Sequence, residues 1–226
     1  MPATSQATPA AFDEVFAEVA AAGESAVVLT LSSKLSGTYQ SACIAATEYD
    51  NIYVVDSASV AIGSAILAEL AIQWIEEGVS AKEVADRLEE EKKKVRIVAL
   101  LDTLEYLKRG GRISKTIAFA GGIMNIKPVA AIIDGEIVVL GKARGSKQGN
   151  NLLVSEIDKA GGVDFNKPVL LGYTGLSDLL LQKYMEDSKA LWEGKKERLN
   201  TTIIGSVIGT HAGPGAIAVA FFQPSK

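Results

Sequence analysis

A short apolar run, Ala26–Thr30, leads into a turn crowded with hydroxyl side chains and then into a helix-like segment. This succession constrains the fold more than any other stretch, because five consecutive apolar or β-branched residues predict a buried strand. The turn holds Ser33, Ser36 and Thr38 as possible donors, and Gly37 lets a ligand approach the backbone closely. A helix that begins here presents free N–H groups and a positive dipole end, so the stretch predicts an α/β unit with an anion site.

The same turn has a simpler interpretation, in which Ser36 or Thr38 only caps the helix. Capping needs one hydroxyl, whereas this turn supplies several, and the surplus favours a ligand site only weakly. At the level of the residues, both interpretations stay open.

Strand-like and helix-like segments alternate up to residue 94, which indicates βαβ units and a parallel sheet. Two clear strands, 26–31 and 51–56, are found there, fewer than a buried parallel sheet needs. We therefore expect residues 1–94 to form an N-terminal parallel-sheet domain that lacks its first strands.

The pattern changes in the second part of the chain. Two strand-like runs meet at Asp134-Gly135, a dipeptide typical of a tight hairpin. Because a hairpin requires antiparallel neighbours, we predict that residues 95–226 form a C-terminal α/β domain with a mixed or antiparallel sheet. The predicted fold class is thus α/β, in two domains.

Composition excludes several classes of protein. The formal net charge is −4 and no basic stripe is evident, which argues against nucleic acid as the main partner. Single cysteine and histidine residues, Cys43 and His211, exclude an intramolecular disulfide and a multi-histidine metal site. Neither a phosphate-binding loop nor a dinucleotide fingerprint is present, so we expect no cofactor.

The N-terminus has no signal-peptide pattern, and the most apolar long window, 58–75, is interrupted by polar residues. We therefore expect a cytoplasmic protein without stable membrane insertion.

Two basic clusters stand in the second part. Lys108, Arg109 and Arg112 surround a glycine pair, where they either compensate a helix C-terminus or anchor a phosphate or a partner's acidic surface. The other cluster, around Arg144, follows the hairpin and is expected to be a solvated loop.

His211 follows Thr210 in a stretch rich in Gly and Pro. We expect this stretch to be a loop between two final strands, Thr202–Ile208 and Ala216–Phe222. Since loops often carry function, Thr210 and His211 are candidates to bind an anion or activate a hydroxyl.

Thr4 and Ser5 offer two further hydroxyls ahead of the first predicted helix. Taken alone, they have the character of a frayed terminus.

Four segments, in this order, are similar to segments of the DegV proteins: Ser32–Ala42, Val54–Ser57, Leu104–Ser114 and Gly209–Ala216. DegV proteins are bacterial fatty-acid-binding proteins that serve as substrate-carrying subunits of fatty acid kinase. The resemblance runs from about Thr4 to Phe222. It departs from the family at the start, where members usually have a strand and a Thr-Asp-Ser-Thr segment some tens of residues earlier.

The resemblance implies a two-domain α/β protein that buries an acyl chain in a tunnel, with the carboxylate between the domains. Thr4 and Ser36 would contact the carboxylate with His211 close by, and Arg112 and Arg144 would help dock a partner. That partner is an ATP-dependent kinase subunit, so this chain would be a carrier and not an enzyme. The candidate ligand-binding residues are together Thr4, Ser5, Ser33, Ser36, Gly37, Thr38, Thr210 and His211.

Two other classes fit the same residues. Ser36 and His211 would serve a hydrolase or acyltransferase if they were in hydrogen-bonding contact and a carboxylate oriented the imidazole. The third candidate is a binding module for a small phosphate or sugar acid.

Overall fold

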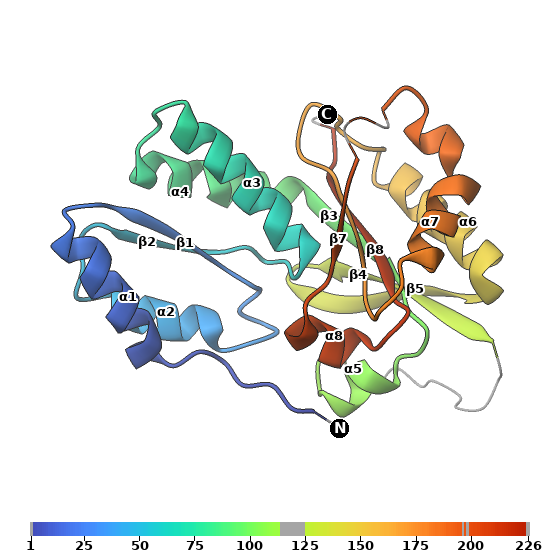
Figure 1. Cartoon of the computed structure of the whole chain (residues 1–226), viewed down its shortest axis with the longest axis horizontal. Helices are drawn as coiled ribbons and strands as arrows, with labels where there is room; N and C mark the ends of the chain where they lie inside the picture. The colour runs from blue at the N-terminus through green and yellow to red at the C-terminus, as the bar shows by residue number, and fades with distance from the viewer. Residues whose placement is uncertain (1, 114–124, 196, 198, 225–226) are drawn as a thin grey trace.

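The computed structural model describes residues 2–113, 125–195, 197 and 199–224. In this part of the chain the strands form two sheets, one of two strands and one of six (Figure 1). Ser114, the last residue of one DegV-like segment, lies outside the described residues.

The first part is a layered α/β unit. Strands β1 and β2 are parallel neighbours, with Thr30 opposite Asp56 at their carboxyl ends. Helices α1 and α2 cover one face of this pair and α3 and α4 cover the other (Figure 1). The elements are α1 (Pro9–Ala21), β1 (Ala26–Thr30), α2 (Thr38–Ala46), β2 (Ile52–Asp56), α3 (Ile62–Glu76), α4 (Ala81–Glu91) and the 3-10 helix η1 (Lys92–Lys94).

The second part is built on the mixed six-stranded sheet, in the order β5-β4-β3-β8-β6-β7. Its pairs are antiparallel except β6 with β7, which run parallel. The elements are β3 (Val95–Leu100), α5 (Glu105–Arg109), β4 (Ile126–Ile133), β5 (Glu136–Arg144), α6 (Gly145–Lys159), β6 (Leu170–Tyr173), α7 (Leu179–Asp187), the 3-10 helix η2 (Lys189–Trp192), β7 (Asn200–Ile203), α8 (Ser206–Ala212) and β8 (Ile217–Phe222).

The predicted hairpin is confirmed. Ile133 pairs with Glu136 across a two-residue turn, and Asp134 and Gly135 have φ values of 49° and 81°. Positive φ at both central positions is the requirement of the type I′ turn, which Asp-Gly satisfies at low cost. The predictions of a parallel sheet with two strands and of a mixed second sheet are likewise confirmed.

The two faces of the large sheet differ in side-chain size. On β8, Ile217, Val219 and Phe221 pack in the core cluster that contains residues of α6 and α7. The alternate positions Ala218 and Ala220 point to the opposite face, toward the first part of the chain. The small side chain of Ala218 leaves room above the sheet, whereas Ala220 is not part of the cavity lining.

The expected final strand Thr202–Ile208 is wrong. Strand β7 ends at Ile203, and the residues from Ser206 form helix α8, which ends before Gly213 at φ 77°. The β-branched residues of the run Thr202–Ile208 are typical of a strand, but Gly205 interrupts that run. One face of α8 lines a cavity, and the residues on this face have helical spacing: Val207, Ile208, His211 and Ala212. Thr210 and His211 therefore lie on a helix rather than in a loop.

The expected loop around Arg144 is also wrong. Residues up to Arg144 continue β5 and pair with β4 as far as Ile126, and α6 starts directly at Gly145. The strand continues because the β4 ladder satisfies its backbone groups.

The division of the chain into residues 1–94 and 95–226 stays a proposal. The six-stranded sheet starts with β3, immediately after residue 94. However, one core cluster extends from α3 and α4 onto β3 and β8. Among the described helices, none is both long and apolar enough to cross a membrane.

Candidate functional site

A cavity lies over the alanine-bearing face of the large sheet, between that sheet and the first part of the chain. It contains about 1040 Å³ of space between atoms, a volume that includes space open to solvent. The floor comes from β3, β4, β5 and β8, with residues Ile97, Ala99, Ala130, Ile137 and Ala218. Opposite the floor are apolar residues from the first part and from α8, among them Leu31, Leu35, Val60, Val207 and Ile208.

The alanines explain why this space is open. Ala99, Ala130 and Ala218 lie on neighbouring strands in direct register, and each is a lining residue. A methyl side chain cannot reach across to the opposite wall, and a protein interior otherwise packs without such gaps. An apolar space of this size is suited to a flexible hydrocarbon.

One end of the cavity is polar. Thr4 Oγ1 and His211 Nε2 are 2.7 Å apart, although the two residues are 207 positions apart in the chain. The Ser36 and Thr38 hydroxyls are hydrogen-bonded at 2.9 Å, and all four residues line the cavity. Ser5 lies among the lining residues as well.

Arg112 adds a positive charge at the same end. Its Nε donates to the Leu35 carbonyl at 3.1 Å and its Nη1 donates to the Gly110 carbonyl at 2.6 Å. These bonds fix the guanidinium among the lining residues, beside the loop that carries Ser36. From the sequence, Arg112 was expected either to compensate a helix C-terminus or to anchor a phosphate or a partner's acidic surface, and its place in the cavity lining was not predicted.

The surroundings of His211 favour the neutral imidazole. Partial burial, and then the nearby charge of Arg112, lower the pKa of His211 below its usual value. Among the described residues, its buried Nδ1 has no hydrogen-bond partner, and it lies against Gly110, where a Cβ would come within 2.2 Å of it. Since an orphaned N–H is rarer than an orphaned acceptor, we infer that Nε2 carries the proton and donates to Thr4.

This arrangement leaves donors for an anion. If Nε2–H donates to Thr4 Oγ1, the Thr4 hydroxyl proton is free for a ligand. Ser36 and Thr38 share one hydroxyl–hydroxyl bond, so one hydroxyl proton of that pair is also uncommitted. Two free hydroxyl donors beside a guanidinium form a site for a carboxylate or another small anion.

The turn after β1 does not cap the helix as one of the two sequence interpretations expected. The Thr38 N–H donates to Ser36 Oγ at 3.3 Å, but the N-cap residue of α2 is Gly37, and no described side chain caps this helix. Both hydroxyls also face the cavity, whose lining contains Ser36 and Thr38. The residue directly before α2 is Gly37, and Gln6 packs so close that a Cβ on Gly37 would lie 2.1 Å from its Oε1.

Four of the candidate residues are not among the cavity lining. Ser33 is exposed, and its backbone N–H donates to the Asp56 carboxylate. The Thr210 hydroxyl donates to the Ser206 carbonyl within α8 at 2.8 Å. Arg144 is exposed at the end of β5, and Gly37 is covered by Gln6.

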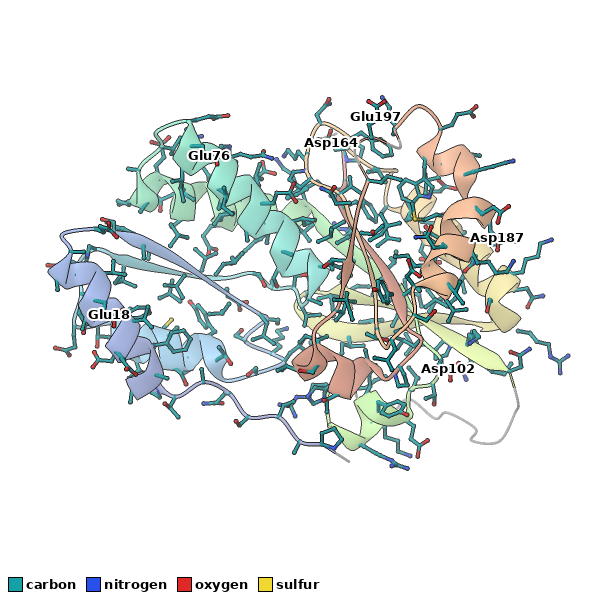
Figure 2. The ribbon with its side chains drawn as sticks, in the orientation of Figure 1. Glu18, Glu76, Asp102, Asp164, Asp187 and Glu197 are labelled. Carbon is teal, nitrogen blue, oxygen red and sulfur yellow. The ribbon has the colours of Figure 1, made fainter. Side chains whose placement is uncertain are left out.

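The geometry gives no triad. His211 is bonded to Thr4 and not to Ser36, and the described lining contains neither Asp nor Glu. Acidic side chains such as Glu18 and Glu76 lie on the outer surface (Figure 2). A carboxylate that could orient His211 is therefore absent from the described cavity wall.

Sequence reasoning missed the alanine floor and the role of Gln6, whose amide donates to Ser41 Oγ at 3.2 Å. A signal for the floor exists, because alanine occurs at every second position of the run from Ala216 to Ala220. No local pattern links Gln6 to α2.

Comparison with known proteins agrees with this architecture. The sequence profile described as "Uncharacterised protein, DegV family" matches residues 1–224. The DegV domain-containing protein TTE1491 of Caldanaerobacter subterraneus subsp. tengcongensis is 36% identical, over 98% of this chain and 79% of that relative. A protein named fatty acid-binding protein, from Thermotoga maritima, is 31% identical over 84% of this chain and 66% of that relative.

A solved structure titled "Fatty Acid Binding of a DegV family Protein from Thermus thermophilus" is 30% identical. It superposes with a TM-score of 0.86, covering 99% of this chain and 80% of that one. The fold and its cavity thus define a two-sheet α/β protein with a largely apolar cavity over its larger sheet. The chain belongs to the DegV family.

Proposed function

We propose that this protein binds a long-chain fatty acid, with the acyl chain in the apolar cavity and the carboxylate at its polar end. The observation that carries the proposal is that one cavity has both an apolar body and a polar end. The polar end is formed by Thr4, Ser36, Arg112 and His211. Relatives whose titles name fatty-acid binding support the same ligand class.

The energetics assign different tasks to the two ends. About fourteen buried methylenes at about 0.8 kcal/mol each give roughly 11 kcal/mol before the entropic costs of binding. Hydrogen bonds from hydroxyls to the carboxylate add about 1.5–3 kcal/mol each. The tail therefore supplies most of the affinity, and Thr4 and Ser36 fix the direction in which the acid lies.

We further propose that the chain presents this acid, in the cytoplasm of a bacterium, to a separate ATP-dependent kinase subunit that forms the acyl phosphate. The absence of a phosphate-binding loop in the sequence supports a carrier rather than an enzyme. Arg144 is exposed and available for such docking. Arg112 lies at the polar end of the cavity, so it would contact the partner beside the bound carboxylate.

Mass spectrometry of the organic extract of the purified protein tests the ligand class. A long-chain acid in near-stoichiometric amount is expected. A protein without lipid that instead hydrolyses activated esters would overturn the carrier function in favour of an acyl hydrolase.

Ser36→Ala tests the carboxylate end. Losing one hydrogen bond to a charged group should weaken fatty-acid affinity by about tenfold or more. Ser33→Ala is the matched control, because it makes the same change in the same turn but outside the lining. Equal titration curves for the two variants would contradict the role of Ser36.

A further inference from the structure

We propose that Ile97 and Ile204 form the end wall of the cavity and set the longest acyl chain that the protein accepts. This inference rests on the proposed function, because it names the substrates within that class. It follows from where the two isoleucines lie relative to the polar end.

The two ends of the cavity are continuous with different parts of the core. The polar end adjoins a small core cluster that contains three lining residues, Leu101, Leu107 and Ala216. Ala212, which follows His211 in the chain, packs against the same cluster. Ile97 and Ile204 belong instead to the cluster around α3. Leu101 directly follows β3 and is four residues from Ile97, which is about 13 Å if the chain stays extended.

The far end is closed by the first turn of α3. A Cβ on Gly63 would lie 3.5 Å from the Cβ of Ile97, so Ile97 sits against this turn. A Cβ on Gly172 would lie 3.0 Å from both Ile204 and Ile62. The sheet below and the helix beyond therefore hold both isoleucines in place.

Side-chain chemistry makes this end stiff. Isoleucine is branched at Cβ and loses most χ1 freedom in a packed setting. Ile97 is only 5% exposed. Two residues from Ile97 toward Leu101, the floor is a row of alanines in register, Ala99, Ala130 and Ala218, which leave room for a chain to pass. A tail anchored at Thr4 and Ser36 thus crosses the alanines and stops at the isoleucines.

The expected behaviour is a break in a homologous series. For delipidated protein and saturated acids from dodecanoic to eicosanoic, affinity should rise about fourfold for each added methylene while the tail still has room. It should stop rising at the acid whose methyl end reaches Ile97. Chain lengths beyond this break must bend or leave carbons in water.

Ile97→Ala removes side-chain carbons from the end wall, so the break should move to an acid at least one carbon longer. That acid should bind at least about fourfold more tightly than it does to the unsubstituted protein. Ile97→Val is a milder variant that keeps the fold even if alanine does not. Ile157→Ala and Ile157→Val are matched controls, because Ile157 is fully buried on the opposite face of the sheet.

Three results decide the question. A break that moves in the Ile97 variants and stays fixed in the Ile157 variants supports the end wall. A break that stays fixed in the Ile97 variants, although acids still bind, overturns the end wall and leaves the carrier function standing. Failure of the unsubstituted protein to bind any acid overturns the proposed function and the end wall with it.

Discussion

Filling the cavity with a side chain should stabilise the empty protein and weaken the binding of its ligand. Ala218 is 3% exposed and lines the cavity floor. Ala218→Leu adds three carbons that enter existing space. At about 0.8 kcal/mol per buried carbon the gain is about 2.4 kcal/mol, less about 0.5–1 kcal/mol of lost side-chain entropy. The free energy of unfolding should rise by about 1.5 kcal/mol.

The control lies two residues further along the same strand. Ala220 is 0% exposed on the same face of β8, but it packs against the α3 cluster and is not part of the cavity lining. Leucine there has no space to enter, and overpacking should cost about 1–3 kcal/mol. The same substitution should therefore raise the free energy of unfolding at Ala218 and lower it at Ala220.

Urea denaturation of delipidated protein measures both effects, with an unchanged m value as the check on two-state behaviour. In Ala218→Leu the displaced tail loses the burial of about three methylenes, so fatty-acid affinity should fall by about 50-fold. If Ala218→Leu destabilises the protein as much as Ala220→Leu does, the space above Ala218 is not open and the reasoning fails.

Two further predictions concern the stability of the fold around the cavity. Ser32 is 0% exposed, and its hydroxyl donates to the Gly135 carbonyl at 2.7 Å, which joins the turn after β1 to the β4–β5 hairpin. Ser32→Ala should therefore lower the free energy of unfolding by about 1–3 kcal/mol in urea denaturation. An unchanged midpoint would show that the contact does not hold the two parts together. Because the pKa of His211 is lowered in the folded state by partial burial and by Arg112, the unfolded protein binds more protons between that pKa and about 6.5, so stability should fall as the pH drops through this window. His211→Gln should remove this component of the pH dependence, and identical profiles for the two proteins would contradict the assignment.

Local sequence signals were sufficient where short-range physics decides the structure. The apolar run Ala26–Thr30 forms β1, as predicted, and the turn after it leads into α2. Asp134-Gly135 predicted the hairpin since its two positive φ values suit few other dipeptides. The site residues Thr4, Ser36 and His211 were singled out from their residue types and from the DegV resemblance.

The rest depends on contacts that no local pattern records. The sequence predicts a strand as far as Ile208 and a loop after it, because an apolar β-branched run is followed by a stretch rich in glycine. The helical face of α8 is recognisable only once the cavity is in view. Thr4 meets His211 across nearly the whole chain. Ala218 and Ala220 are indistinguishable in sequence and both belong to the core cluster around α3, yet only Ala218 also lines the cavity.

The most direct test of the account is a crystal structure of the protein with a long-chain acid that carries bromine at its terminal carbon. The account predicts anomalous density for bromine beside Ile97 and Ile204, and the carboxylate within hydrogen-bonding distance of Thr4 and Ser36. Bromine at the polar end, or an acid bound outside the cavity, would contradict it.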